Sequence, residues 1–181
     1  MRKFPLFFLA AAWVSLSAAG CGYSTSRMLP AAYRTIYIEP FRNGIQFTQE
    51  VSDRLGLQTT LPEIEETVTR EVISQFITDG NLRITTKREE ADLVLEGELT
   101  SFYRQSLRRL PDNTAEEYRL NLSASLKLHD RSGKLLFSEP NLVGDTTYFA
   151  AGSSAVNEST AVTKLVTDFS RRAVERVIED W

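Results

Sequence analysis

Two long segments of the chain alternate between apolar and polar side chains. Residues 93–104 place Tyr103 on the apolar parity and Arg104 on the polar one, and residues 118–129 repeat the same alternation. A period of two is typical of strands that bury one face. Because residues 110–117 join the two segments, we predict a long antiparallel hairpin with one apolar and one polar face.

Two further segments carry apolar residues at the helical period of 3.6 residues. Before the first, Thr60, Pro62 and Glu63 form a capping-box pattern that places Glu63 in the first turn, and Gly80 follows at the stop. The second predicted helix runs from about residue 154 to residue 181. The stripe positions are Leu61, Ile64, Val68, Val72, Ile73, Phe76 and Ile77 in the first helix, and Val162, Leu165, Val166, Phe169, Ala173, Val174, Val177, Ile178 and Trp181 in the second.

Shorter apolar or β-branched runs complete the pattern, separated by turn residues. Residues 42–59 lack any period and are predicted to be an irregular connection. Two amphipathic helices and a sheet with one apolar face predict an α+β fold: a two-layer sandwich of about four mostly antiparallel strands, covered on one face by two helices. The shorter predicted strands are residues 33–41, 82–86, 134–139 and possible extended residues 143–149.

Gly97 occupies the apolar face of its predicted strand, where a side chain is expected. Glycine at such a position often marks a close approach of another backbone. We therefore expect a helix to pass tightly over Gly97.

The N-terminus has the order of a secretory signal: Arg2 and Lys3, then an apolar run, then small residues. The run of about a dozen residues is shorter than the roughly 20 that span a bilayer. Cys21 follows Ala18-Ala19-Gly20, a pattern similar to a bacterial lipobox, although Ala18 replaces the usual leucine. We expect residues 1–20 to be a lipoprotein signal peptide, residues 21–32 a lipidated tether and residues 33–181 one domain. A plain signal with an incidental cysteine is the alternative.

Lipidation at Cys21 would anchor the mature chain stably through several acyl chains. Gly22 after the cysteine, in place of the aspartate common in inner-membrane lipoproteins, favours the periplasmic face of the outer membrane. Apart from this covalent lipid, no cofactor is expected.

Composition excludes several classes of site. One cysteine and one histidine in 181 residues cannot build a disulfide, a thiolate metal site or a CxxC pair. A net charge of -3 argues against a nucleic-acid binder. The lone histidine, His129, falls on the polar parity and is expected to be solvent-exposed. No nucleophile-elbow, zinc-protease, phosphate-loop or dinucleotide motif occurs, so an enzyme is the least favoured class.

Four arginines stand out on the predicted polar face of the hairpin. Arg104, Arg108, Arg109 and Arg119 would cluster near its tip, with Arg108 nearly opposite Arg119. Guanidinium groups bind phosphates and carboxylates through paired hydrogen bonds, so the cluster is a candidate site for an anionic glycolipid. In the alternative interpretation, the acidic loop residues Asp112, Glu116 and Glu117 neutralise it.

The order and spacing of several short motifs resemble the LptE family of lipopolysaccharide-assembly lipoproteins, from Cys21 nearly to the C-terminus. These motifs are Cys21-Gly22-Tyr23, Leu29-Pro30, Thr35-Ile36-Tyr37-Ile38, Phe41-Arg42-Asn43, Ala91-Asp92-Leu93-Val94-Leu95-Glu96-Gly97 and Ala115-Glu116-Glu117-Tyr118.

The resemblance implies a lipid-anchored domain that plugs the LptD β-barrel in a one-to-one complex and contacts lipopolysaccharide. It also implies basic residues just before a TAEY-like loop, a position that Arg108 and Arg109 match. A second basic position near the last helix is occupied here by Ala155, Val156 and Asn157. The alternative is an outer-membrane lipoprotein of the TolB-N-like or LpoB-like type, which recognises a periplasmic enzyme or secretion channel.

Overall fold

The computed structural model describes residues 32–45, 63–111 and 115–179. The lipobox at Cys21, most of the tether, the Thr60-Leu61-Pro62 part of the capping box and Trp181 lie outside the described residues. In chain order the elements are β1 (Thr35–Ile38), β2 (Arg42–Asn43), α3 (Ile64–Asp79), β3 (Arg83–Ile84), the 3-10 turn η1 (Arg88–Glu90), β4 (Leu93–Arg109), β5 (Ala115–Asp130), β6 (Leu135–Phe149) and α4 (Glu158–Glu179).

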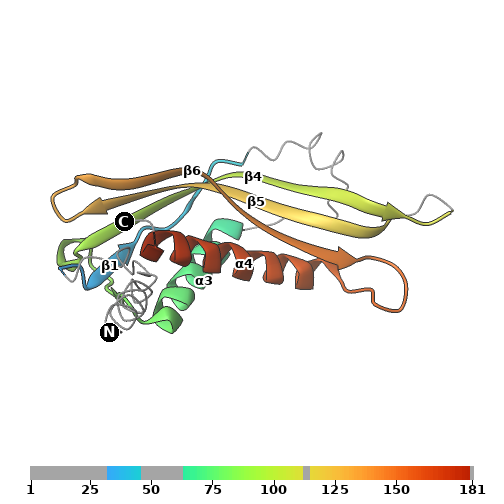
Figure 1. Cartoon of the computed structure of the whole chain (residues 1–181), viewed down its shortest axis with the longest axis horizontal. Coiled ribbons are helices and arrows are strands. Elements are labelled where there is room, and N and C mark those ends of the chain that lie inside the picture. Colours follow the sequence, from blue (N-terminus) through green and yellow to red (C-terminus); the bar gives the residue numbers. More distant parts are fainter. Residues whose placement is uncertain (1–31, 46–62, 112–114, 180–181) are drawn as a thin grey trace, which may run out of the picture.

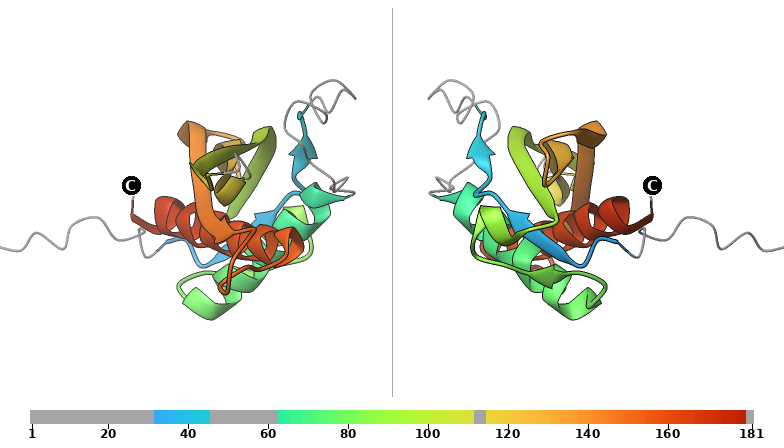
Figure 2. Two further views of the ribbon diagram at one scale, coloured as in Figure 1. Left: turned by 90° about the vertical axis from the view of Figure 1, so that its right-hand side faces the viewer. Right: turned by 90° about the vertical axis from the view of Figure 1, so that its left-hand side faces the viewer.

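The six strands form one mixed sheet in the order β3-β1-β4-β5-β6, with β2 beside β4 further along the same strand. The three short strands run parallel to their neighbours, whereas β4, β5 and β6 are antiparallel. Both helices lie on one side of the sheet (Figures 1 and 2). The predicted two-layer α+β fold is confirmed; β2 and β3, of two residues each, add to the four longer strands.

The predicted parity is correct along β5 but fails halfway along β4. The even-numbered residues from Leu120 to Leu128 are all buried, as expected. In β4, a register shift between Leu99 and Ser101 inserts one extra residue opposite β5. Beyond this bulge Phe102 is buried and Tyr103 is exposed, the reverse of the prediction.

A second bulge lies at the same level on the other side of β5. Here β6 pairs Glu139 with Leu126 and Leu142 with Ala124, so Pro140 falls in the irregularity, where its missing N–H breaks no ladder bond. The predicted pieces 134–139 and 143–149 are therefore one continuous strand. We refer to the part of β4, β5 and β6 beyond these bulges, towards the β4–β5 connection, as the distal half of the hairpin.

Both predicted helices form, with corrected starts. α3 begins at Ile64, and Glu63 precedes it in the left-handed region with a φ of 60°, so Glu63 is not in the first turn. The Ile64, Val68, Val72 and Phe76 stripe is buried, but Ile77 is exposed. Gly80 ends the helix at a φ of 76° and donates its N–H to the carbonyl of Phe76, as the sequence predicted.

α4 begins at Glu158, because Asn157 acts as its N-cap. The Asn157 side-chain oxygen accepts hydrogen bonds from the Thr160 amide at 2.8 Å and from the Ser159 and Thr160 hydroxyls. The buried face of α4 packs against β6, β5 and α3 (Figure 1).

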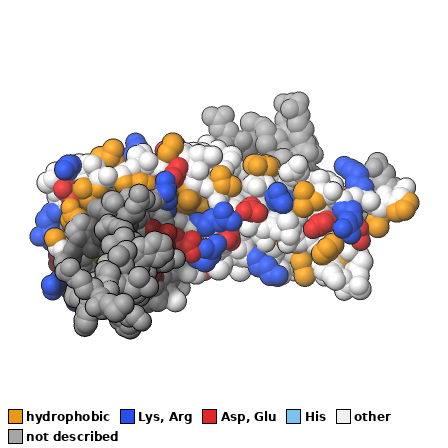
Figure 3. Space-filling view, viewed as in Figure 1, with side chains coloured by type: hydrophobic (Ala, Val, Ile, Leu, Met, Phe, Trp, Pro, Cys, Tyr) orange, Lys and Arg blue, Asp and Glu red, His pale blue; other side chains and the backbone are white. Residues whose placement is uncertain are grey.

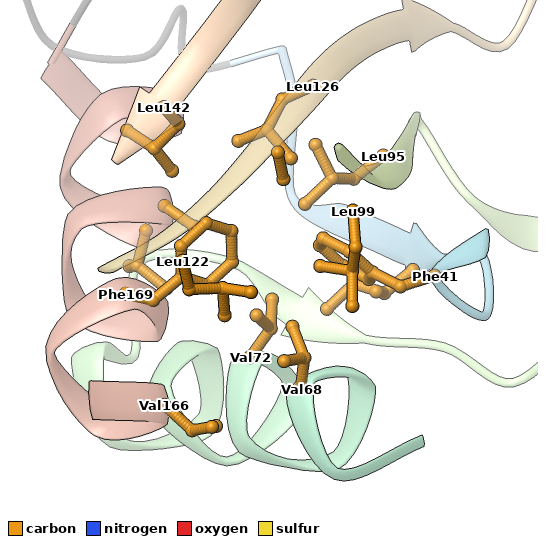
Figure 4. Packing of buried hydrophobic residues seen from close by; sticks show 14 of the residues in the cluster. Phe41, Val68, Val72, Leu95, Leu99, Leu122, Leu126, Leu142, Val166 and Phe169 are labelled. Carbon is orange, nitrogen blue, oxygen red and sulfur yellow. The ribbon is translucent and has the colours of Figure 1, made fainter. Parts of the chain in front are cut away.

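Glycine permits close packing at two points of the sheet. A Cβ on Gly97 would lie 2.3 Å from the Phe41 ring, so the close approach is real, but its partner is a side chain between β1 and β2 and not a helix. Phe41 in turn packs edge-on against Phe169 of α4, with 6.2 Å between ring centroids (Figure 4). The tight passage of a helix occurs instead at Gly144 of β6, where a Cβ would meet the Phe169 backbone at 2.7 Å.

Candidate anion-binding end of the hairpin

The structure separates the four arginines into two groups. Arg104 pairs with Leu120 and therefore lies on the helix-facing side of the sheet. Arg119 is opposite Gln105 and Arg108 is opposite Glu117, on the other side. The predicted placement of Arg104 on the polar face is therefore wrong, whereas Arg108 lies close to the predicted position, diagonal to Arg119 and not directly opposite it. Two extra residues in β4, at the bulge after Leu99 and the shift after Ser106, cause the difference.

Arg104 joins the hairpin to the start of α4. Its Nη1 lies 2.6 Å from Glu158 Oε2, and the Tyr148 hydroxyl donates to the same carboxylate oxygen at 3.1 Å. The guanidinium carbon stands 4.3 Å from the centre of the Tyr118 ring, which stacks on Tyr148 with centroids 5.7 Å apart. One cation, one anion and two aromatic rings thus form a compact unit, which we call the arginine–tyrosine cluster.

Burial and charge act in opposite directions within this cluster. Burial disfavours the charged guanidinium, but the Tyr148 hydrogen bond and the Glu158 charge outweigh it and raise the Arg104 pKa. Burial also raises the pKa of Tyr148, partly offset by Arg104. The Arg104 and Glu158 side chains are only 13% and 16% exposed. Arg104 is therefore committed to an internal partner.

Arg108, Arg109 and Arg119 remain at the surface. The Arg108 side chain is 62% exposed, and its nearest carboxylate, Glu116, is 3.7 Å away. Arg119 is exposed and forms no ion pair with any residue that the structure describes. Because Arg108 opposes Glu117, which is two residues from Arg119, the two arginines are diagonal neighbours on one face, about 7–8 Å apart. Arg109 follows opposite Ala115.

Lys and Arg side chains gather at this end of the molecule beside acidic and apolar ones (Figure 3). Among the described loop carboxylates, Glu116 lies 3.7 Å from Arg108, at the long end of ion-pair distances. Asp112 lies outside the described residues. Exposed arginines such as Arg108 and Arg119 can bind phosphate or carboxylate oxygens with bidentate geometry.

Glu158 was not among the residues predicted from the sequence to belong to this end of the hairpin. A glutamate directly after the N-capping Asn157 is a recognisable sign of a helix start, but nothing local predicts that Arg104, far away in sequence, will reach it. The prediction that His129 is solvent-exposed is wrong, because its side chain is only 19% exposed and its Nδ1 lies 3.7 Å from Glu96 Oε1.

A groove of about 450 Å³ runs between β6 and α4. Its cations are paired: Arg176 with Glu139 at 2.9 Å, and Arg172 with Asp145 at 3.0 Å. The cations of this groove are therefore less available to a bound anion than Arg108 and Arg119 at the hairpin end.

The described residues show neither a cluster of metal ligands nor a membrane-spanning helix. Within residues 32–45, 63–111 and 115–179, no three side chains of the metal-ligating types come together. Over the same ranges, no helix has both the length and the apolar character needed to cross a membrane.

Comparison with known proteins gives one family. The family model described as "LptE: Lipopolysaccharide-assembly" matches residues 33–181. No curated protein sequence matches significantly.

Solved structures share the fold at low sequence identity. Uncharacterized lipoprotein B from Nitrosomonas europaea is 13% identical with a TM-score of 0.53, covering 83% of this chain and 84% of its own. The hypothetical protein CT253 from Chlamydia trachomatis is 14% identical with a TM-score of 0.52, covering 80% and 95%. Protein XCC0632 from Xanthomonas campestris is 11% identical with a TM-score of 0.52, covering 83% and 90%.

Proposed function

The chain belongs to the LptE lipopolysaccharide-assembly family, and from this membership we propose that it is a non-enzymatic outer-membrane lipoprotein that plugs an LptD-type β-barrel and helps to deliver lipopolysaccharide to the outer leaflet. The family match carries this proposal, because it covers residues 33–181 and so includes every described strand and helix.

The lipid on Cys21 is the proposed anchor. A diacylglyceryl thioether and an N-acyl chain on one residue supply enough buried hydrocarbon for stable attachment. The folded domain would then sit at the periplasmic face of the outer membrane or inside the lumen of the partner barrel.

The open face of the sheet suits a polar lumen. On β4 and β5 it carries Glu98, Gln105, Arg119 and Lys127, a mixture of charged and neutral polar groups. The interior of a large barrel is polar, whereas its lipid-facing side is apolar. A one-to-one complex would place this face against the barrel wall.

Lipopolysaccharide contact is proposed for the exposed arginines Arg108, Arg109 and Arg119. Their guanidinium groups match the phosphates of an anionic glycolipid. Arg104, expected from sequence to belong to this set, instead holds the distal half of the hairpin against α4 through Glu158. Its contribution to binding is therefore indirect.

A pull-down from detergent-solubilised envelopes tests the plug. Affinity-tagged full-length chain should recover a large β-barrel protein in a one-to-one complex. A Cys21→Ala variant with a cleavable secretory signal should be released from the membrane fraction, which separates anchoring from barrel binding. Recovery of the chain alone, or with a periplasmic enzyme in place of a barrel, contradicts the plug.

The glycolipid site is tested by reversing charge at the hairpin end. Arg108→Glu with Arg109→Glu should weaken lipopolysaccharide binding by about tenfold or more, because two cations become anions next to phosphate. The control, Arg83→Glu with Lys134→Glu, makes the same charge change at exposed positions away from the hairpin tip. Equal binding by both double variants would remove Arg108 and Arg109 from the site.

A further inference from the structure

The two long edges of the sheet differ in how far their main-chain groups are already hydrogen-bonded. The first edge is that of β6. Along its outer edge the Asp145 amide donates to Asp168 Oδ2 of α4 at 3.1 Å, and the Asn141 amide donates to Glu139 Oε1 at 3.2 Å. Pro140 has no amide hydrogen, and the Phe149 carbonyl accepts from the Val156 amide at 2.9 Å. Along this edge, the main-chain groups with which another strand would pair are therefore either already hydrogen-bonded to side chains or to the following loop, or missing at the proline.

The distal half of β4 has no comparable protection among the described residues. β1 covers Leu93–Leu95 and β2 covers Glu98–Leu99. From Ser101 to Arg109, β4 pairs with β5 on one side and with no described strand on the other. Nine residues at about 3.3 Å each give an edge of roughly 30 Å.

The register identifies which main-chain groups point outward from this edge. The main-chain N–H and C=O of Asp145 point away from β5, towards α4. Asp145 pairs with Asn121, so the main-chain groups of Asn121 point away from β6 and hydrogen-bond with Tyr103 of β4. Alternation then directs the amides of Phe102 and Ser106 away from β5. These are the groups available to an added strand.

The same nine residues carry apolar surface. Tyr103 is 42% exposed and Leu107 is 41% exposed, two of only a few large hydrophobic residues at the surface of the described chain. A long edge strand with exposed apolar side chains is a typical site of pairing with another polypeptide.

We propose that the β4 edge from Ser101 to Arg109 binds an extended strand of the barrel partner, which continues the sheet by β-addition. The inference rests on the proposed function for the identity of the partner. Main-chain hydrogen bonds supply the affinity, and Tyr103 and Leu107 supply apolar contacts.

Charge defines the chemistry of the added strand. Its end next to the hairpin tip faces Arg108 and Arg109, and among the described residues the ion-pair partner of Arg108 is Glu116, at 3.7 Å. The added strand therefore carries carboxylates near this end and apolar residues opposite Tyr103 and Leu107. A strand with basic residues there would be repelled.

Hydrogen exchange of the co-purified complex against the free chain tests the pairing. Peptides covering residues 101–109 should exchange at least about tenfold more slowly in the complex, since the outward amides gain acceptors. Peptides covering the outer edge of β6 should change less. Unchanged exchange across 101–109 in an intact complex would overturn the proposal.

Two matched proline variants give a second test. Ser106→Pro removes an outward amide without breaking the β4–β5 ladder, and Thr147→Pro does the same on β6, because its groups point outward like those of Asp145. Ser106→Pro should lower barrel recovery by about tenfold while Thr147→Pro leaves it near wild type. Thermal unfolding of each variant shows whether the fold persists.

The outcomes separate this proposal from the function on which it rests. No barrel in the wild-type pull-down contradicts the function itself. A barrel complex that Ser106→Pro and Thr147→Pro affect equally retains the function and contradicts the β4 edge. Pairing of two copies of this chain through β4 would appear as a homodimer and would also overturn the proposed occupant.

Discussion

Single residues decide how closely the layers of this fold can approach. Gly97 and Gly144 each leave space that an aromatic residue fills, and Phe169 contacts both Phe41 and the backbone of β6 at Gly144. The core therefore depends on two positions without side chains as much as on the leucines around them (Figure 4).

Gly97→Val should destabilise the domain by about 1–3 kcal/mol, because the first added carbon already overlaps the Phe41 ring. Urea unfolding measures the free energy. Combining Gly97→Val with Phe41→Leu should recover part of the loss, since the ring that causes the overlap is gone. If Gly97→Val leaves the unfolding free energy unchanged, the close contact is not a constraint.

Sequence reasoning located Gly97 correctly but not the group that covers it. The alternation of side chains along residues 93–104 places Gly97 on the apolar face, and this pattern can be found from neighbouring residues alone. Phe41 reaches it from the connection between β1 and β2, a contact between residues far apart in sequence. The placement of Arg104 failed for a related reason, since one inserted residue after Leu99 reverses the side chains from Ser101 to Ser106, where a second shift follows.

Polar contacts join α4 to the long strands. The distal half of the hairpin is tied to the start of α4 by the arginine–tyrosine cluster, and the middle of α4 is tied to the edge of β6 by Asp168. Both helices and the strands β4 and β5 were predictable because their apolar periods extend over many residues, whereas β6 was predicted only as two separate pieces. The strand β3 lies within the predicted strand at residues 82–86, whereas β2 lies in the segment predicted to be irregular, and neither β2 nor the polar ties have a periodic signal.

The Arg104–Glu158 pair should behave as a partly buried ion pair. Glu158→Gln leaves the guanidinium without its counter-charge and should cost about 2 kcal/mol of unfolding free energy, less than the ~3–5 of fully buried pairs because both side chains reach some solvent. Arg104→Met with Glu158→Leu should restore most of the loss. A double variant that is less stable than both single variants would contradict this interpretation.

Asp168 should make the α4–β6 contact sensitive to acid. Burial alone raises its pKa, but Arg171, the Asp145 amide and Arg172 together lower it below the ordinary value of 3.8. A lowered folded-state pKa gives stabilisation that is present above 3.8 and lost as the pH falls through the folded value. Asp168→Asn should therefore reduce stability at pH 7 and much less at pH 2. Equal losses at both values, measured by urea unfolding, would exclude this linkage.

At the scale of the whole molecule, each end of the domain has a separate proposed task. In this proposal Cys21 would attach the chain to the membrane, the open face and the β4 edge would meet the barrel, and the exposed arginines of the hairpin end would meet the glycolipid. The family and the overall architecture were accessible from the order of short motifs and from the periodicity. Which surface binds which partner depended on the register of β4, which only the structure supplied.

The most direct test of a role in lipopolysaccharide assembly is the arrival of newly made lipopolysaccharide at the cell surface when this chain is depleted. Pulse-labelled lipopolysaccharide, made accessible to a surface-restricted modifying enzyme, should fall in step with depletion and recover when the wild-type chain is supplied from a second copy. Unchanged surface arrival after the chain has been removed would contradict the proposed function.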